Sequence, residues 1–254
     1  MAIKKHIPNI ITLLNLLSGS IAVLYAVNSN FLMAAFFMFL GIFFDFFDGF
    51  FARLLNVKSE LGLQLDSLAD MVTSGLVPGL VMFKLLSLSL RPSGSLVEDA
   101  WSELAIWTGL NVPVLAFAGL FITLASAYRL AKFNIDEEQQ SYFKGLPTPA
   151  NAILILSFPL ILEFQNSHFV HELILNEWFL IGLTLLSCYL LNSNIKLFAL
   201  KFSDWSFKTN AVRYLFIGLT LILLLVFKFI AVPLIIAIYI LLSVLVNTSE
   251  LFKK

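Results

Sequence analysis

Four aspartates lie in two apolar stretches of this sequence, where carboxylates are costly. Asp45 and Asp48 interrupt a run of phenylalanines in FFDFFDGFFARLL (43–55), and Asp66 and Asp70 follow in LGLQLDSLAD. A carboxylate at the centre of a membrane helix costs at least about 2.5–3.5 kcal/mol. Four clustered carboxylates would also repel one another unless cations neutralise them. The residue types therefore indicate a site for divalent cations, and oxygen ligands favour Mg²⁺ or Mn²⁺ over zinc.

The first pair of aspartates shares one helix face with an arginine. Asp45, Asp48 and Arg53 lie at positions i, i+3 and i+8, and the small residues Gly49 and Ala52 continue the same stripe. Phenylalanines cover most of the remaining circumference. We therefore expect this helix to present a narrow polar stripe inward and phenylalanine to lipid or to packed neighbours.

The second pair repeats the arrangement. Gly62, Asp66 and Asp70 follow at i, i+4 and i+8, and the short loop 56–61 joins the two helices as an antiparallel pair. The two acidic faces can then meet near the cytoplasmic ends. Two divalent cations about 3.5–4 Å apart stabilise the attacking and leaving oxygens of a phosphoryl displacement. From spacing alone, a structural polar cluster or an ion pathway stays open as an alternative.

The elements that position these residues are membrane helices. The 254 residues are 59% hydrophobic and 13% charged, whereas soluble domains have about 25% charged residues. The apolar residues come in blocks of about 20, the length that crosses a bilayer. We predict an all-α polytopic membrane helical bundle of about eight transmembrane helices, with seven as the alternative. The blocks are 8–27, 31–55, 62–89, 111–133, 149–164, 177–193, 211–228 and 230–247.

The distribution of lysine and arginine predicts the orientation. With a cytoplasmic N-terminus, all but three of the 16 basic residues fall on the cytoplasmic side, the exceptions being Lys84, Arg91 and Lys228. We expect both termini and the opening of the site to face the cytoplasm, in the cytoplasmic membrane. The chain 1–254 is interpreted as a single integral membrane domain, with a catalytic core of about 7–201 and a C-terminal helix pair of about 211–247. The zero net charge gives no indication of nucleic-acid binding.

The order Asp-x2-Asp-Gly-x2-Ala-Arg-x8-Gly-x3-Asp-x3-Asp, from Asp45 to Asp70, resembles the signature of the CDP-alcohol phosphatidyltransferase family at all eight fixed positions. This resemblance implies transfer of a phosphatidyl group from a CDP-lipid to an alcohol, with release of CMP. It implies that Asp45, Asp48 and Asp66 hold two divalent cations, Mg²⁺ or Mn²⁺. It implies that Asp70 acts as the general base and also lies near a metal. The family resemblance further suggests a homodimer.

The CDP-lipid would lie along the same polar stripe. Gly49 and Ala52 leave room for the nucleotide, and Arg53 can bind a phosphate through two hydrogen bonds. The resemblance assigns Ser59 and Gly62 to the donor site as well, although Ser59 could equally cap the next helix. The opening IPNIITLLN resembles the Pro-Asn-x-x-Thr start that lines the nucleotide pocket in this family. The CDP-lipid residues predicted in this way are Asn9, Thr12, Gly49, Ala52, Arg53, Ser59 and Gly62, whereas packing is favoured for Asn15.

Two later segments concern the acceptor. AYRLAKFN (127–134) and FKGLPTPAN (143–151) resemble segments of the phosphatidylserine synthase subfamily, as does SNIKLFALK (193–201), with departures at Lys132 and Asn151. The implied substrates are CDP-diacylglycerol and L-serine. The residues predicted to bind the acceptor are Arg129, Lys132, Lys144, Gly145 and Pro147.

Two alternatives to a serine acceptor remain. A synthase for a phosphorylated acceptor, glycerol 3-phosphate or an inositol phosphate, would need more arginines than the four present. A cation transporter would need acidic residues across the bilayer, yet the last three apolar blocks contain none before Glu250 apart from Glu177 at the start of the sixth. Both alternatives are therefore less favoured.

Overall fold

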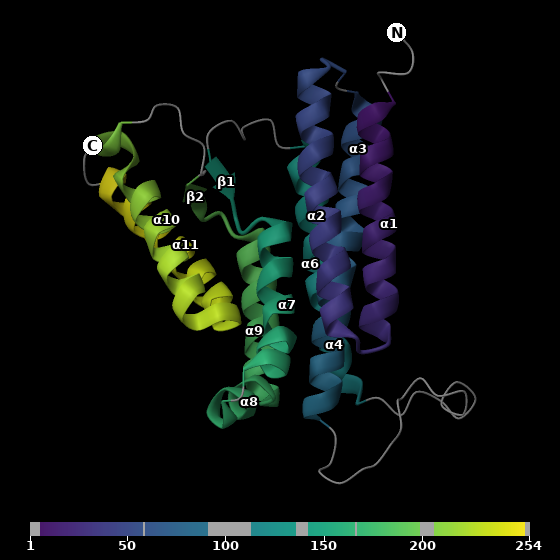
Figure 1. Cartoon of the computed structure of the whole chain (residues 1–254), viewed down its shortest axis with the longest axis vertical. Helices are drawn as coiled ribbons and strands as arrows, with labels where there is room; N and C mark the ends of the chain where they lie inside the picture. The colour runs from purple at the N-terminus through teal and green to yellow at the C-terminus, as the bar shows by residue number, and fades with distance from the viewer. Residues whose placement is uncertain are drawn as a thin grey trace.

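The computed structural model describes residues 6–57, 59–90, 113–135, 142–165, 167–198 and 206–251. These residues form mainly helices that run along the long axis of the molecule (Figure 1). The N-terminal half contains α1 (Ile7–Val27), α2 (Phe31–Leu54), α3 (Glu60–Asp70), η2 (Met71–Leu76), α4 (Val77–Ser89), η3 (Val114–Leu120) and α6 (Phe121–Ile135). The C-terminal half contains β1 (Tyr142–Lys144), α7 (Thr148–Phe164), α8 (His168–Ile174), α9 (Glu177–Asn192), β2 (Lys196–Phe198), α10 (Phe207–Phe227), η4 (Lys228–Ile230) and α11 (Ala231–Leu251).

Local sequence signals set the ends of the first three helices. Pro8 lies in the first turn of α1, where its missing N–H costs nothing. The Asn30 side chain accepts a hydrogen bond of 3.1 Å from Met33 N and so caps α2. Ser59 caps α3 by accepting a hydrogen bond of 3.0 Å from Gly62 N. The loop between α2 and α3 turns at Asn56, whose φ is +52°. Helices α2 and α3 therefore run in opposite directions, and both pack on α1.

The expected outward phenylalanine face of α2 is confirmed in part. Phe43, Phe46 and Phe50 are exposed by 54%, 64% and 43%. The other phenylalanines of this segment are half-buried and stack against them. On the opposite side of α2, Asp48 is 6% exposed. The helix therefore separates an aromatic outer face from a polar inner one.

The third apolar block forms a single helical span of 30 residues, Glu60–Ser89. Its middle part, η2, is π-helical, and the parts on either side are α-helical. The π-helix begins directly after Asp70, and Pro78 lies just beyond its end. Gly75, within η2, brings this backbone close to α6, because its carbonyl accepts a hydrogen bond of 3.1 Å from Thr123 Oγ1. Small residues allow such close approach between membrane helices.

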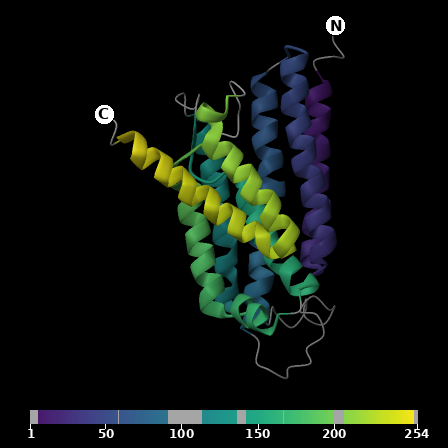
Figure 2. The same cartoon turned by 60° about the vertical axis from the view of Figure 1, so that its left-hand side comes forward.

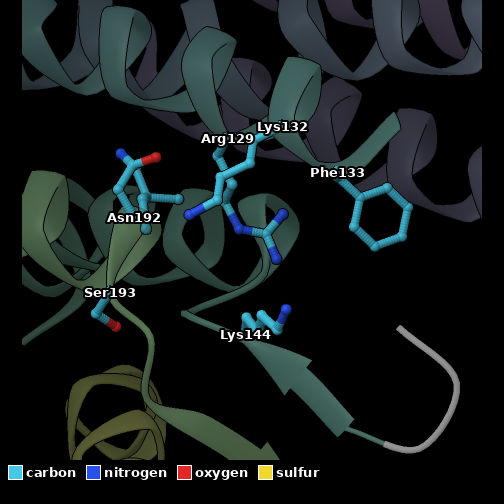
Figure 3. A pocket seen from close by; sticks show the side chains of 7 residues that line it. Arg129, Lys132, Phe133, Lys144, Asn192 and Ser193 are labelled. Atoms are coloured by element: carbon cyan, nitrogen blue, oxygen red, sulfur yellow. The ribbon is translucent and has the colours of Figure 1, made fainter. Parts of the chain in front are cut away.

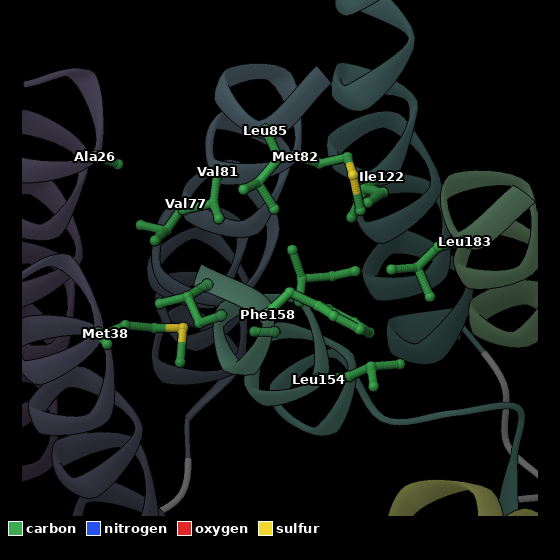
Figure 4. Packing of buried hydrophobic residues seen from close by; sticks show 14 of the residues in the cluster. Ala26, Met38, Val77, Val81, Met82, Leu85, Ile122, Leu154, Phe158 and Leu183 are labelled. Atoms are coloured by element: carbon green, nitrogen blue, oxygen red, sulfur yellow. The ribbon is translucent and has the colours of Figure 1, made fainter. Parts of the chain in front are cut away.

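The apolar core lies around α4, which contacts α1, α7, α9 and η3 (Figure 4). Val77, Val81, Met82 and Leu85 of α4 are fully buried. They pack with side chains such as Met38 of α2 and Phe158 of α7. A helix that is buried on most of its circumference provides a fixed support for the polar segment α3 at its N-terminal end.

A two-stranded antiparallel ribbon joins segments on either side of α7–α9, a feature that the all-α prediction did not include. In its register Tyr142 pairs with Phe198, Phe143 with Leu197 and Lys144 with Lys196. The C-terminal helices α10 and α11 lie beside each other and next to this ribbon (Figure 2). The ribbon therefore connects the C-terminal helix pair to the end of the bundle at which α6 ends.

Among the described residues, five helices are long and apolar enough to span a membrane. The number is six if α8 and α9, which are bent by 62°, form one span. Helix α7 has 17 residues and falls short of that length, and α10–α11 meet the criterion as one stretch of 37 residues, Asn210–Val246. The helical membrane architecture is thus confirmed, whereas the count of eight and the orientation stay predictions. Several residues behind the orientation lie outside the described ranges, among them Lys4, Lys5, Lys58 and Arg91.

Candidate active site

The two acidic helix faces do meet. Asp45 and Asp48 of α2 and Asp66 of α3 each offer a carboxylate oxygen, and these three oxygens all lie within 4.8 Å of one another. The antiparallel arrangement of α2 and α3, which the short loop between them imposes, brings these residues together. Carboxylate oxygens at such separations suit a divalent cation, since Mg²⁺ binds oxygen at about 2.0–2.1 Å in octahedral geometry. The donor set therefore fits a hard metal ion.

Asp70 lies next to this group of three carboxylates. The carboxyl group of Asp45 is close enough to those of Asp66 and Asp70 to interact with both. On its other side, Asp70 Oδ1 accepts a hydrogen bond of 3.3 Å from Asn15 Nδ2 of α1. Asp70 is thus the carboxylate of the four that a neutral amide of another helix holds in place.

Asn15 is itself fixed by η2. Thr73 Oγ1 donates a hydrogen bond of 2.7 Å to Asn15 Oδ1, so that the amide nitrogen points to Asp70. Space for this pair comes from Gly41 of α2, where a Cβ would lie 2.6 Å from Thr73 Cγ2 and 2.9 Å from Asn15 Oδ1. The sequence favours packing for Asn15, but the structure gives it a contact with a predicted catalytic residue. The signal was its position three residues after Thr12, on the same helix face.

The predicted nucleotide residues of α1 lie against the acidic helices. Thr12 Oγ1 donates a hydrogen bond of 2.6 Å to Asp48 Oδ2 and therefore orients a predicted metal ligand. Asn9 lies one turn before it, close to the start of α3, since a Cβ on Gly62 would be 3.3 Å from Asn9 Oδ1. Helix α1 thus supplies polar side chains along the whole length of the acidic site.

The remaining predicted donor residues lie toward the ends of α2 and α3. Arg53 is exposed, and its Nε donates a hydrogen bond of 2.9 Å to Gly49 O. Ala52 is half-buried one residue before it. Ser59 is the cap of α3, which is one of the two roles expected for it, and its hydroxyl is exposed there. A phosphate-containing ligand would therefore reach the carboxylates past the Arg53 guanidinium.

A second polar site, which we call the cationic pocket, lies between the end of α6, the ribbon and the end of α9. Arg129, Lys132 and Lys144 point into a common space there (Figure 3). The complete lining is Arg129, Lys132, Phe133, Lys144, Leu191, Asn192 and Ser193. Three of the five predicted acceptor residues therefore line one pocket, whereas Gly145 and Pro147 do not. Phe133, Asn192 and Ser193 were not predicted.

Arg129 connects the cationic pocket to the acidic site. Its guanidinium is close enough to Asp70 to interact with it electrostatically. Its Nε is buried and has no hydrogen-bond partner among the described residues. Because buried polar groups are nearly always hydrogen-bonded, this nitrogen has a donor capacity that the described residues leave unused.

Gly145 shapes the cationic pocket through the backbone. Its φ is +72°, and its N donates a hydrogen bond of 2.9 Å to Ile195 O. A Cβ there would lie 2.7 Å from Leu191 O, so a side chain would push the segment away from α9. Pro147 precedes α7 as its N-cap residue. Gly145 therefore keeps the segment after Lys144 close to the end of α9, and Pro147 begins α7 directly beyond it.

The described residues form a helical membrane protein whose acidic site can hold a divalent cation next to a cationic pocket. The chain belongs to the CDP-alcohol phosphatidyltransferase family, because the sequence model of that family matches residues 5–189. It is therefore an enzyme of a transferase family. The ribbon strand β2 and helices α10 and α11 lie beyond the matched region.

Curated relatives carry closely related names. A CDP-diacylglycerol–serine O-phosphatidyltransferase of Bacillus subtilis is 33% identical over 156 residues, which cover 61% of this chain and 76% of that protein. A protein of the same name from Helicobacter pylori is 28% identical over 217 residues, covering 85% and 81%. An archaetidylserine synthase of Methanothermobacter thermautotrophicus is 27% identical over 155 residues, covering 60% and 57%.

Proposed function

We propose that this enzyme transfers the phosphatidyl group of CDP-diacylglycerol to the hydroxyl of L-serine, giving phosphatidylserine and CMP. The observation that carries the proposal is the proximity of the two sites: Arg129 lines the cationic pocket and is near enough to Asp70 of the acidic site to interact with it electrostatically. An acceptor carboxylate in the pocket would bring its hydroxyl toward that aspartate. Serine appears in the name of each relative described above, two serine O-phosphatidyltransferases and an archaetidylserine synthase, and these names support the same choice.

The acidic residues would hold two divalent cations, Mg²⁺ or Mn²⁺. Asp45, Asp48 and Asp66 form the converging group. Asp70 lies outside that group but interacts with Asp45 and Asp66, and it would contribute to the second cation. Metal bound there would neutralise the pyrophosphate and make CMP a better leaving group. The chain's own contribution is to orient the ligands, as Thr12 does for Asp48.

The donor would lie along α1, α2 and α3. Its two acyl chains stay in the bilayer, and the nucleotide enters past the exposed Arg53. Asn9, Thr12, Ser59 and Gly62 would line the nucleotide on one side, and Gly49 and Ala52 leave room for it on the other. A guanidinium can bind a phosphate with two parallel hydrogen bonds, which an ammonium group cannot.

In the transfer step Asp70 would accept the proton of the serine hydroxyl. The serine oxygen forms a bond to the phosphatidyl phosphorus, and the bond from that phosphorus to the bridging pyrophosphate oxygen breaks, so that CMP leaves. A positioned general base contributes about 10²–10⁴-fold to rate. Asn15, held by Thr73, keeps the Asp70 carboxylate in the orientation that this proton transfer needs.

The acceptor would bind in the cationic pocket. The serine carboxylate suits Arg129, Lys132 and Lys144, whose side chains converge there (Figure 3). The side-chain oxygen Oδ1 of Asn192 is buried without a partner among the described residues, so it can accept a hydrogen bond from the serine ammonium. Gly145 and Pro147 would set the shape of the pocket without contacting the ligand through side chains.

Purified enzyme with labelled CDP-diacylglycerol tests the proposal. It is offered L-serine, glycerol 3-phosphate or an inositol phosphate in separate reactions with Mg²⁺ or Mn²⁺, and the lipid product is identified. We expect phosphatidylserine and a stoichiometric release of CMP with serine alone. Product formation with a phosphorylated acceptor instead would overturn the serine assignment but leave the family reaction intact. No CMP release with any acceptor would contradict the reaction itself.

The arrangement in the cell follows from the same proposal. Arg53 in the last turn of α2 and Lys132 in the last turn of α6 support an opening of the site on the cytoplasmic face, because basic residues favour that side of a membrane. We expect eight spans, cytoplasmic termini, one integral membrane domain over 1–254 and a homodimer. Cysteine labelling from either side of oriented vesicles tests the first two, and crosslinking in detergent and in membranes tests the dimer.

A further inference from the structure

The ribbon that carries Lys144 into the cationic pocket is too short to be stable by itself. Each strand has three residues, and an isolated two-stranded ribbon is marginal in water even when it is longer. The ribbon therefore needs support from another part of the fold.

That support comes from the C-terminal helix pair. Tyr239 of α11 donates a hydrogen bond of 2.8 Å from its hydroxyl to Phe198 O of β2. The ring centroids of Phe198 and Tyr239 are 5.0 Å apart, and the rings meet edge to face. The ring centroid of Phe216 of α10 lies 6.0 Å from that of Phe198 and 5.5 Å from that of Tyr239. We call Phe198, Phe216 and Tyr239 the aromatic clamp. It joins β2, α10 and α11 at one point.

The aromatic clamp is linked to the cationic pocket by a short series of backbone contacts. Phe198 is the last residue of β2, and Lys196 pairs with Lys144 across the ribbon. Ile195, directly before β2, accepts a hydrogen bond of 2.9 Å from Gly145 N, and Ser193 lines the pocket two residues earlier. A displacement of β2 would thus move Lys144 on the paired strand and Ser193 in the segment that leads from α9 into β2.

The aromatic clamp and the acidic site lie on different elements of the fold. The helix pair lies beyond residues 5–189, which match the family, and the four aspartates lie on α2 and α3. Among the described elements, α11 packs on β2 and α7, and α10 packs on α11. Loosening the clamp would therefore disturb the cationic pocket and leave the acidic site as it is.

We infer that Phe198 and Tyr239 are positioning residues, through which the C-terminal helix pair holds the cationic pocket in the shape that binds the acceptor's anionic group. The inference rests on the proposed function only in taking serine as the ligand of that pocket. It assigns the helix pair a part in acceptor affinity, a role separate from the transfer chemistry.

Tyr239→Phe is the sharpest test, because it keeps the ring contacts and removes only the hydrogen bond to Phe198 O. Ser243→Ala is the matched control: Ser243 lies one turn further along α11, is 1% exposed, and donates only to Tyr239 O within its own helix. Initial rates of CMP release are measured against serine at saturating CDP-diacylglycerol, and then against CDP-diacylglycerol at saturating serine. Phe198→Leu serves as a second variant that removes the ring contacts and keeps the backbone bond.

We expect Tyr239→Phe to raise the KM for serine about threefold to tenfold, the range that one neutral hydrogen bond allows. The kcat and the KM for CDP-diacylglycerol stay at the wild-type values, as do all constants of Ser243→Ala. Phe198→Leu raises the serine KM as well. A merely structural clamp would lower kcat by reducing the amount of folded enzyme and leave the serine KM unchanged.

Three outcomes would overturn the inference: an unchanged serine KM in both clamp variants, an equal rise in the KM of both substrates, or the same rise in Ser243→Ala. Each of them leaves the proposed function standing, because wild-type enzyme still forms phosphatidylserine. If wild-type enzyme releases no CMP with serine, the proposed function fails instead. The clamp is then tested by binding of serine alone, read as a shift in thermal unfolding that Tyr239→Phe diminishes.

Discussion

Replacement of Asn15 by leucine tests whether the hydrogen bond to Asp70 matters for transfer. Asn15 Nδ2 lies 3.3 Å from Asp70 Oδ1, and Asn15 is fully buried. Leucine has a similar size and no donor, so it removes the contact and leaves little empty space. The substitution leaves Asp70 without a neutral partner on α1 and frees its side chain to rotate.

The magnitude follows from the kind of bond. A hydrogen bond to a charged group contributes about 1.5–3 kcal/mol, and about 1.4 kcal/mol corresponds to a factor of ten. The distance of 3.3 Å is slightly longer than the usual 2.7–3.2 Å, so the lower end of that range applies. We therefore expect kcat to fall about tenfold, with a smaller fall for Thr73→Val, which removes the hydroxyl that orients the Asn15 amide.

The assay is CMP release at saturating CDP-diacylglycerol and serine, with the thermal midpoint measured in parallel. Ser20→Ala is the control on the same helix, because Ser20 is exposed and donates only to Leu16 O of α1. A wild-type kcat in Asn15→Leu, together with a wild-type thermal midpoint, would refute the reasoning. A loss of kcat that is matched by an equal loss of folded protein would refute it as well.

The remaining predictions concern the acidic site and the loop at Gly145. Asp70→Asn should lower kcat by about 10²–10⁴-fold, because the general base is lost, and a stable variant with normal rates would remove Asp70 from that role. Chelation should abolish CMP release, and Mg²⁺ or Mn²⁺ should restore it; Thr12→Val should require a higher metal concentration, since Asp48 loses the hydroxyl 2.6 Å away. Gly145→Ala should lower the thermal midpoint and raise the serine KM, because its Cβ would lie 2.7 Å from Leu191 O; unchanged values of both would show that the loop can shift at no cost.

The convergence of the aspartates could be predicted because it depends on local rules. The period of 3.6 residues places Asp45 with Asp48 and Asp66 with Asp70, and a short loop makes consecutive helices antiparallel. The apolar blocks likewise predict the helices, since a membrane allows few other structures. These inferences need no knowledge of which helices pack together later in the chain.

The features that escaped prediction depend on contacts between distant segments. Strands of three residues are too short to show alternation, and β1 and β2, which α7–α9 separate in the sequence, meet only in the folded structure. Asn15 looked like an ordinary interhelical polar residue, because its partners Asp70 and Thr73 lie on another helix. Asn192 and Ser193 enter the cationic pocket for the same reason.

The π-helix η2 changes which face the long helix Glu60–Ser89 presents before and after it. A π-turn bonds residue i to i+5, so the residues after it are shifted in phase by one position, about 100° around the axis. The stripe of Gly62, Asp66 and Asp70 would otherwise continue down the helix into the apolar interior. The phase shift instead ends that stripe at Asp70 and turns Gly75 toward α6. One long helix thereby presents carboxylates to the acidic site in its first half, α3, and packs apolar side chains on its neighbours in its second half, α4, and η2 is the boundary between the two halves.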